Sequence, residues 1–205
     1  MASNVTFRPA RLSYLPNTPS SGTLGAGHHI RARDSYVIEE RPCSDPAALV
    51  AALFEEYRTP IAAYLYSLLD DWELAHDLAQ QTFLSALRAQ EQLAQVENRR
   101  AWLYRVASNL AFNALKRRRR FTWLPWRKAD SIMKSQGDPS DEIVEVIAIE
   151  RALAELPPHY RAPLLLFSYY GLSTREVAEV LDLSEGATRV RLHRARRMFR
   201  QVYTG

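Results

Sequence analysis

Residues 172–202 constrain the fold of this chain most strongly, because they have the pattern of two short helices joined by a tight turn. Ser173 and Glu176 have the spacing of a capping box, which predicts where the first helix begins. Ser184, followed by Glu185, predicts the start of a second helix. Along that helix runs an inward apolar stripe made of Leu192, Ala195, Phe199 and Val202. The combination predicts a helix-turn-helix, whose second helix enters the major groove of DNA.

The charge pattern favours a nucleic-acid partner over a merely solvated helix face. Arginines recur along the second predicted helix, and another basic run lies at residues 116–120, although the net charge is only +4. Most charge runs are solvated surfaces, but here the turn, the caps and the one-sided basic charge coincide. Clustering of this kind suits a polyanion such as DNA.

Several functional classes lack their signatures. Cys43 is the single cysteine, which excludes an intramolecular disulfide or a cysteine-cluster metal site and favours a reducing cytoplasm. We find no glycine-rich phosphate loop, no Cys/His nucleophile pair and no metal-ligand spacing, since the adjacent His28 and His29 have no further ligands. We therefore expect no catalytic residue, no cofactor and no metal. No apolar run approaches the roughly 18 residues of a membrane helix, so no membrane insertion is expected.

Helical periodicity divides the chain into two parts. Residues 1–44 are rich in Pro, Gly and Ser without a sustained period, which predicts a flexible N-terminal arm. Periodic apolar residues then predict a first domain at 45–120 and a second at 142–205, joined by a flexible linker at 121–141. The aromatic residues at 121–126 either pack back onto the first domain, which we favour, or contact a partner. Since no segment alternates with period two, the predicted class is all-α.

We expect four helices in the first domain. Asp45 and Pro46 begin the first, and Thr59-Pro60 predicts that it ends there and that a second begins. Asp71 caps the third and Asn98 the fourth. The predicted inward residues of the third helix are Leu74, Ala75, Leu78, Thr82 and Leu87, and those of the fourth are Leu103, Val106, Ala107, Leu110 and Ala114.

Two sets of motifs resemble a known family. Asp-Leu-Ala-Gln-Gln-Thr-Phe at 77–83, Arg-Ala-Trp-Leu-Tyr-Arg-Val-Ala-Ser-Asn-Leu at 100–110 and the basic run at 116–120 resemble region two of extracytoplasmic-function (ECF) sigma factors. Leu-Ala-Glu-Leu-Pro-Pro-His-Tyr-Arg at 153–161 and the run at 183–196 resemble region four. Both occur in the family's order with a linker between them. The resemblance implies a bacterial protein that joins core RNA polymerase, recognises a promoter and opens it.

The resemblance implies that the second predicted helix of the helix-turn-helix recognises the −35 promoter element. Arginines at early positions reach base edges, and Val190 suits a thymine methyl group. Arginines farther along suit phosphates. The candidate residues for this contact are Ser184, Arg189, Val190, Arg191, Arg194 and Arg197.

The resemblance implies that the fourth helix of the first domain recognises the −10 element and captures a base from the opened duplex. Asparagines offer a donor and an acceptor to a base edge, and a Trp or Tyr offers a stacking surface. Trp102 is equally well explained as a core aromatic, and Tyr104 is a second stacking candidate. The candidate residues are Trp102, Arg105, Asn109, Asn113, Lys116 and Arg117. The chain departs from the family in Asn113, where aspartate is frequent, and in Thr188, at a usually apolar position.

The resemblance also implies protein partners. The polar face formed by Asp77, Gln80, Gln81 and Phe83, the last expected to be an exposed aromatic, resembles the part that docks on the β′ clamp helices of core RNA polymerase. The β flap and an anti-sigma factor are further possible partners. Two alternatives remain open at this point. One is a helix-turn-helix regulator that acts without polymerase, and the other is a helical protein whose basic face meets an acidic partner or a membrane surface.

Overall fold

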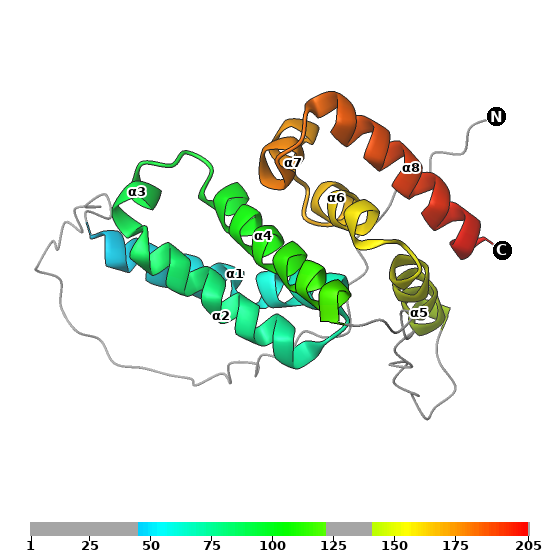
Figure 1. Cartoon of the computed structure of the whole chain (residues 1–205), viewed down its shortest axis with the longest axis horizontal. Helices are drawn as coiled ribbons and strands as arrows, with labels where there is room; N and C mark the ends of the chain where they lie inside the picture. The colour runs from blue at the N-terminus through cyan, green and yellow to red at the C-terminus, as the bar shows by residue number, and fades with distance from the viewer. Residues whose placement is uncertain (1–44, 122–140, 205) are drawn as a thin grey trace, which may run out of the picture.

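The structure of the protein is a computed structural model, and it describes residues 45–121 and 141–204 (Figure 1). Within them every secondary-structure element is a helix, so the all-α prediction is confirmed. We call α1–α4 the first unit and α5–α8 the second unit. The first unit consists of α1 (Pro46–Leu69), α2 (Trp72–Arg88), α3 (Gln90–Ala94) and α4 (Arg99–Phe121), and the second of α5 (Asp141–Ala154), α6 (Pro158–Ser168), α7 (Thr174–Leu181) and α8 (Glu185–Tyr203).

The predicted helix starts are confirmed by side chains that accept hydrogen bonds from backbone N–H groups. Asp45 accepts from Ala47 at 2.9 Å, and Asp71 accepts from Leu74 at 3.0 Å. The Oδ1 atom of Asn98 accepts from the N–H of Ala101 at 2.9 Å. Each such cap contributes about 1 kcal/mol to helix stability.

The prediction that a helix ends at Thr59-Pro60 is wrong, because α1 continues through Pro60. An internal proline costs a helix about 3 kcal/mol or more. Both halves of α1, however, place side chains in one core: Val50 and Leu53 before the proline, and Ile61, Tyr64, Leu65 and Leu68 after it. Because each buried aliphatic side chain contributes about 1.5–3 kcal/mol, burial outweighs the cost of the proline.

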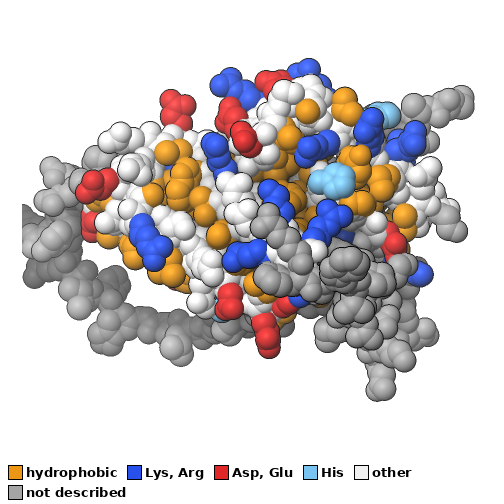
Figure 2. Space-filling view, in the orientation of Figure 1, with side chains coloured by type: hydrophobic (Ala, Val, Ile, Leu, Met, Phe, Trp, Pro, Cys, Tyr) orange, Lys and Arg blue, Asp and Glu red, His pale blue; other side chains and the backbone are white. Residues whose placement is uncertain are grey.

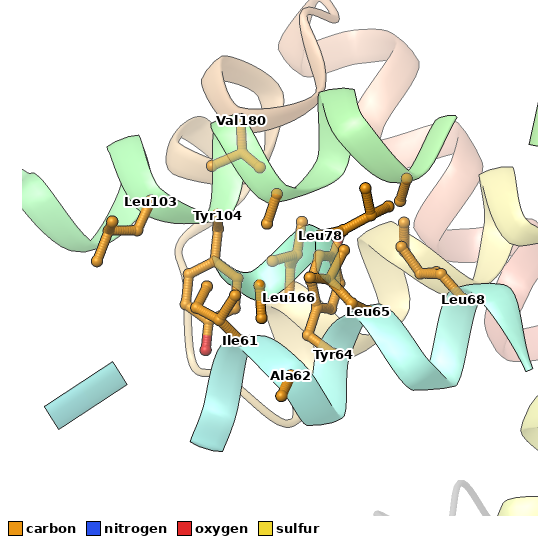
Figure 3. Close-up of a cluster of buried hydrophobic side chains, with 14 of the residues drawn as sticks. Ile61, Ala62, Tyr64, Leu65, Leu68, Leu78, Leu103, Tyr104, Leu166 and Val180 are labelled. Carbon is orange, nitrogen blue, oxygen red and sulfur yellow. The ribbon is translucent and has the colours of Figure 1, made fainter. Parts of the chain in front are cut away.

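The core of the first unit lies between α1, α2 and α4 (Figure 3). Tyr64 is fully buried, and its hydroxyl is hydrogen-bonded to the Ser108 hydroxyl at 2.8 Å, so its polar atom has a partner. Thr82 is likewise buried and donates to the Leu78 carbonyl at 2.8 Å. Leu87, predicted to face inward, is 47% exposed, because the buried stripe of α2 passes through Ala86 instead.

The two units pack against each other. The buried cluster that contains Tyr64 and Leu103 also contains Leu166 of α6 and Val180 of α7 (Figure 3). The contact is made chiefly by α7 on α4 and by α6 on α1. A smaller separate core in the second unit contains Leu156, Leu164 and Ala195. The predicted arm at 1–44, most of the predicted linker and the predicted packing of residues 121–126 lie outside the described residues, and the predicted domain boundaries stay predictions.

Arg161 is a buried arginine that ties α6 to two helix ends. It donates to the carbonyl of Leu156 at 2.9 Å and to that of Ala154 at 2.6 Å, both at the end of α5. It also donates to the carbonyl of Ser67, near the end of α1. Carbonyl groups at helix C-termini lack intrahelical donors and carry partial negative charge, which suits a guanidinium. Burial lowers the pKa of Arg161 to about 10, so the side chain keeps its charge at neutral pH.

We predict that Arg161→Met lowers the free energy of unfolding by about 3 kcal/mol, because the three carbonyl groups would lose a charged donor inside the protein. Urea denaturation of the full chain measures the change. Arg175→Met is the matched control, since Arg175 is exposed and pairs with Glu179 on its own helix. Equal stability of the two variants would contradict the structural role of Arg161.

Candidate nucleic-acid interface

The helix-turn-helix predicted from the sequence is formed by α7 and α8. The capping box at Ser173 and Glu176 is present in full at the start of α7. Asp182 ends α7 in the left-handed region, with φ of 53°, and turns the chain toward α8. Ser184 then caps α8 by accepting from the N–H of Ala187 at 3.2 Å. The turn and both helix starts therefore arise from local capping chemistry.

The inner face of α8 fixes which side chains point outward. Thr188 is fully buried, as are Leu192 and Ala195. The Thr188 hydroxyl donates to the carbonyl of Ser184 at 3.0 Å, so its polar atom has a partner at this buried position. Val202, predicted to face inward, is 41% exposed, because α8 extends past the elements it packs against. Of the predicted apolar stripe, Leu192 and Ala195 are therefore core, and Phe199 is partly buried against the core of the second unit.

The outer face of α8 carries the residues predicted to contact the −35 element. Val190 is 51% exposed, so its methyl groups are accessible to a partner. Arg189 forms an exposed ion pair with Glu185 at 2.7 Å, which contributes at most about 1 kcal/mol and gives way readily to a phosphate. Arg191 is half-buried. The exposed members of the predicted set are Ser184, Arg189, Val190, Arg194 and Arg197.

The polar stripe of α4 also faces outward. Trp102 is half-buried against the core. Its position is thus intermediate between an exposed stacking surface and a core aromatic, the two roles that the sequence allows. Arg118 points elsewhere, donating to the carboxylate of Asp71 at 2.7 Å, so it helps to hold the α1–α2 connection. The exposed members of the predicted −10 set are Arg105, Asn109, Asn113, Lys116 and Arg117.

Tyr104 does not have the exposed position that base stacking requires. It is 1% exposed, and its ring lies 5.4 Å from that of Tyr64 and 4.8 Å from that of Tyr170. Burial raises the pKa of the Tyr104 hydroxyl well above its ordinary value. The expectation that Tyr104 offers a stacking surface is therefore wrong in this conformation, and Trp102 is the remaining candidate.

The predicted polymerase-binding face of α2 needs one correction. Asp77, Gln80 and Gln81 are exposed as expected. Phe83 is buried, with its ring centre 5.0 Å from that of Phe54 in an edge-to-face arrangement. The period of the α2 stripe already indicated this, because Phe83 lies four residues after Ala79 and three before Ala86. The exposed apolar side chains of α1 and α2 that were not predicted are Phe54, Trp72, Leu84 and Leu87.

Basic side chains of both units meet on one face of the molecule, where α4 approaches α6 and α8 (Figure 2). His159, at the start of α6, has a pKa below its ordinary value because of partial burial and the charges of Arg191 and Arg119. Arg119 belongs to α4 and Arg191 to α8. The two candidate DNA-contacting helices therefore bring positive charge to the same region.

No helix within residues 45–121 and 141–204 is long and apolar enough to cross a membrane. In the same part of the chain, no group of three or more His, Cys, Asp or Glu side chains has the proximity that a metal ion needs.

Comparisons with known proteins decide the family. The family model for Sigma-70 region 2 matches residues 53–121, and the model for Sigma-70, region 4 matches residues 147–199. The ECF RNA polymerase sigma factor SigL of Mycobacterium tuberculosis is 33% identical over 158 residues, which cover 75% of this chain and 88% of SigL. The chain belongs to the ECF sigma factors.

Other ECF sigma factors extend the comparison. SigG of Mycobacterium tuberculosis is 28% identical over 231 aligned positions, which cover 96% of this chain and 61% of SigG. The fold is similar to that of the sigma factor RpoE from Bartonella quintana, solved in complex with the anti-sigma factor NepR. That match has a TM-score of 0.62 and 21% identity and covers 75% of this chain and 96% of RpoE.

The opposite exposure of Phe83 and Leu84 gives a direct test of the α2 face. We predict that Phe83→Ala lowers the free energy of unfolding by about 3–5 kcal/mol, whereas Leu84→Ala changes it by less than about 0.5 kcal/mol. Chemical denaturation of both variants measures the difference. A small effect of Phe83→Ala would mean that this ring is not part of the core.

Proposed function

We propose that this ECF sigma factor directs core RNA polymerase to its promoters by reading two DNA elements with α8 and α4. The −35 element is read in the major groove by the first turns of α8. Arg189, Arg191 and Arg194 donate to base edges, and the exposed Val190 contacts a thymine methyl group. Ser184 and Arg197 contact phosphates and set the position of the helix.

The −10 element is bound by the exposed stripe of α4. The amides of Asn109 and Asn113 each provide a donor and an acceptor for the edge of an unpaired base. Trp102 provides a stacking surface, and Arg105, Lys116 and Arg117 neutralise phosphates. These polar side chains are exposed along one face of α4, which supports the proposal.

Core polymerase is bound through both units. Asp77, Gln80 and Gln81 bind the β′ clamp helices. Phe54 and Leu84 provide the apolar contact in place of the buried Phe83. The β flap is assigned to the second unit, whose extent we take as 142–205, and the first unit is taken as 45–120. The sigma factor supplies recognition, and phosphodiester synthesis belongs to the polymerase.

The proposal extends to regulation and place of action. RpoE was solved with the anti-sigma factor NepR, and we propose that an anti-sigma factor also binds this chain. Because a sigma factor works with polymerase on the chromosome, the proposed location is the cytoplasm.

The observation that supports this function best is the presence of a region-2 unit beside the helix-turn-helix, with a polar exposed stripe on α4. A regulator that acts without polymerase needs the helix-turn-helix but not this second DNA-reading helix. Promoter opening is therefore the activity that separates the two.

We predict that Asn109→Ala reduces promoter opening about tenfold or more while core-polymerase binding stays near normal, because the amide reads DNA and does not face the clamp. Permanganate footprinting measures strand opening, and fluorescence anisotropy with labelled sigma factor measures core binding. Gln81→Ala, the matched control on α2, is expected to show the reverse: weaker core binding, and normal opening once core is saturated. Equal opening by wild type and Asn109→Ala would remove Asn109 from the site.

A second experiment addresses the −35 contact. We predict that Arg194→Ala costs about 1–3 kcal/mol of binding to the preferred −35 sequence and relaxes preference at one base position. Arg197→Ala is expected to weaken binding equally across sequences and to lower the salt dependence. Competition between randomised −35 sites with the reconstituted holoenzyme distinguishes the two patterns. An unchanged base preference for Arg194→Ala and for the three other early positions would contradict this docking.

A further inference from the structure

Helix α8 carries more positive charge than its own stability requires. It contains six arginines and one carboxylate, that of Glu185. Positive charge stabilises the last turn of a helix, where Arg200 lies, but Arg196 lies a turn earlier. Two like charges four residues apart, as in Arg196 and Arg200, destabilise a helix. This pair therefore suits an anionic partner better than it suits the helix itself.

Arg196 lies on one flank of α8, between the buried face of the helix and its outward face. At 3.6 residues per turn, each side chain leaves the helix about 100° round from the one before it. Ala195 is fully buried, so Arg196, which follows it, lies beside the core and not opposite to it. Val190 and Arg194 of the proposed −35 set lie farther round, on the outward face. Arg200 continues the flank of Arg196, and both arginines are exposed.

The guanidinium of Arg196 is held by an aromatic ring from another helix. Its central carbon lies 4.8 Å from the centre of the Phe167 ring, within the roughly 6 Å at which a ring face attracts a cation. Phe167 is a half-buried residue of α6, which packs against α8 (Figure 1). The ring attracts the charge without accepting a conventional hydrogen bond, so the N–H donors remain available for an oxygen acceptor. The contact therefore positions an exposed cation without neutralising it, whereas Arg189 is paired with a carboxylate.

The dimensions of DNA place this flank against a phosphate backbone. The major groove is about 12 Å wide, and an α-helix with its side chains is about 10–12 Å in diameter. A helix in the groove therefore fills it, so that its outward face meets base edges and its flanks meet the strands at the border. Arg196 and Arg200 are about 6 Å apart along the helix axis, at about 1.5 Å per residue. This spacing is close to the rise of two nucleotides along one strand, about 7 Å, so the two arginines can contact different phosphates of that strand.

We propose that Arg196 and Arg200 form a phosphate clamp on one of the two DNA strands that border the −35 element, and that Phe167 is the positioning residue for Arg196. The inference rests on the proposed use of α8 to read that element. An arginine side chain loses conformational freedom when it binds a phosphate, and the Phe167 ring reduces this loss because it restricts the guanidinium beforehand. The clamp raises the affinity for any DNA sequence and leaves base preference to the first turns of α8.

The salt dependence of DNA binding tests the clamp. The logarithm of the binding constant falls with the logarithm of the salt concentration, with a slope of about 0.9 for each phosphate that is neutralised. We expect Arg196→Ala and Arg200→Ala each to lower this slope by about 0.9 and the double variant to lower it by about 1.8, with base preference in the −35 element unchanged. Fluorescence anisotropy of labelled promoter DNA with the reconstituted holoenzyme, between about 50 and about 200 mM salt, measures the slope.

Arg58→Ala is the matched control for the loss of one positive charge. Arg58 is an exposed arginine of the first unit that also lies over a phenylalanine ring, that of Phe54, at 6.0 Å. With core polymerase at saturation, we expect this variant to keep the wild-type slope. An unchanged slope for Arg196→Ala would overturn the clamp. An altered base preference for that variant would overturn it too, because Arg196 would then read bases and not phosphates.

A double-mutant cycle tests the positioning role of Phe167. Phe167→Leu keeps an apolar side chain on α6 and removes the aromatic ring. We expect it to weaken DNA binding about twofold or more without changing the salt slope, since the charge of Arg196 remains, and to have no further effect in the Arg196→Ala background. Equal weakening in both backgrounds would mean that Phe167 acts only through the fold of the second unit, which would overturn its positioning role.

Failure of the proposed function gives a different pattern. If the wild-type holoenzyme shows no base preference in the −35 element, α8 does not read that element, and the clamp fails with the function. If the preference is present and Arg196→Ala keeps the wild-type slope, the function stands and the clamp alone is wrong.

Discussion

The packing of α7 on α4 is the interaction on which the rest of this structure depends. It joins Val180 to a core that begins with α1 and α2, and with Tyr170 it covers Tyr104, which the sequence analysis took as a candidate for base stacking. On α4, Arg105, Asn109, Asn113 and Lys116 all stay exposed beside this contact, and Arg105 lines a pocket together with Glu179, Asp182 and Glu185.

The local features of the fold follow from the sequence because they depend on near neighbours. The side chains of Asp71, Asn98 and Ser184 each accept from the backbone N–H three residues later. Residue type and spacing are therefore enough to predict these caps. The helix-turn-helix is local in the same sense. The outward positions on α8 follow from the period of Thr188, Leu192 and Ala195, once Thr188 is recognised as a residue whose hydroxyl is satisfied within its own helix.

What the sequence did not predict depends on distant partners. Pro60 is a valid stop signal, and only the burial of side chains on both halves of α1 overrides it. Tyr104 is inward because Tyr170 packs on it from the other unit. The burial of Phe83, in contrast, follows from its spacing to Ala79 and Ala86 on the same helix. The spacing of apolar residues gives information about one helix at a time. It therefore does not show whether a polar or aromatic face of that helix is exposed to solvent or packed against another unit. Helix α4 has both kinds of face, so its periodicity alone does not predict the contact between the units.

The central claim is that the two units pack against each other, chiefly α7 on α4, and so keep a fixed distance from one unit to the other. Spin labels at the exposed residues Arg88 and Gln201, one in each unit, report this distance by pulsed electron paramagnetic resonance. Our account predicts a single narrow distribution of this distance for the free chain, because units that pack against each other cannot move independently. A broad distribution in the free protein would contradict it.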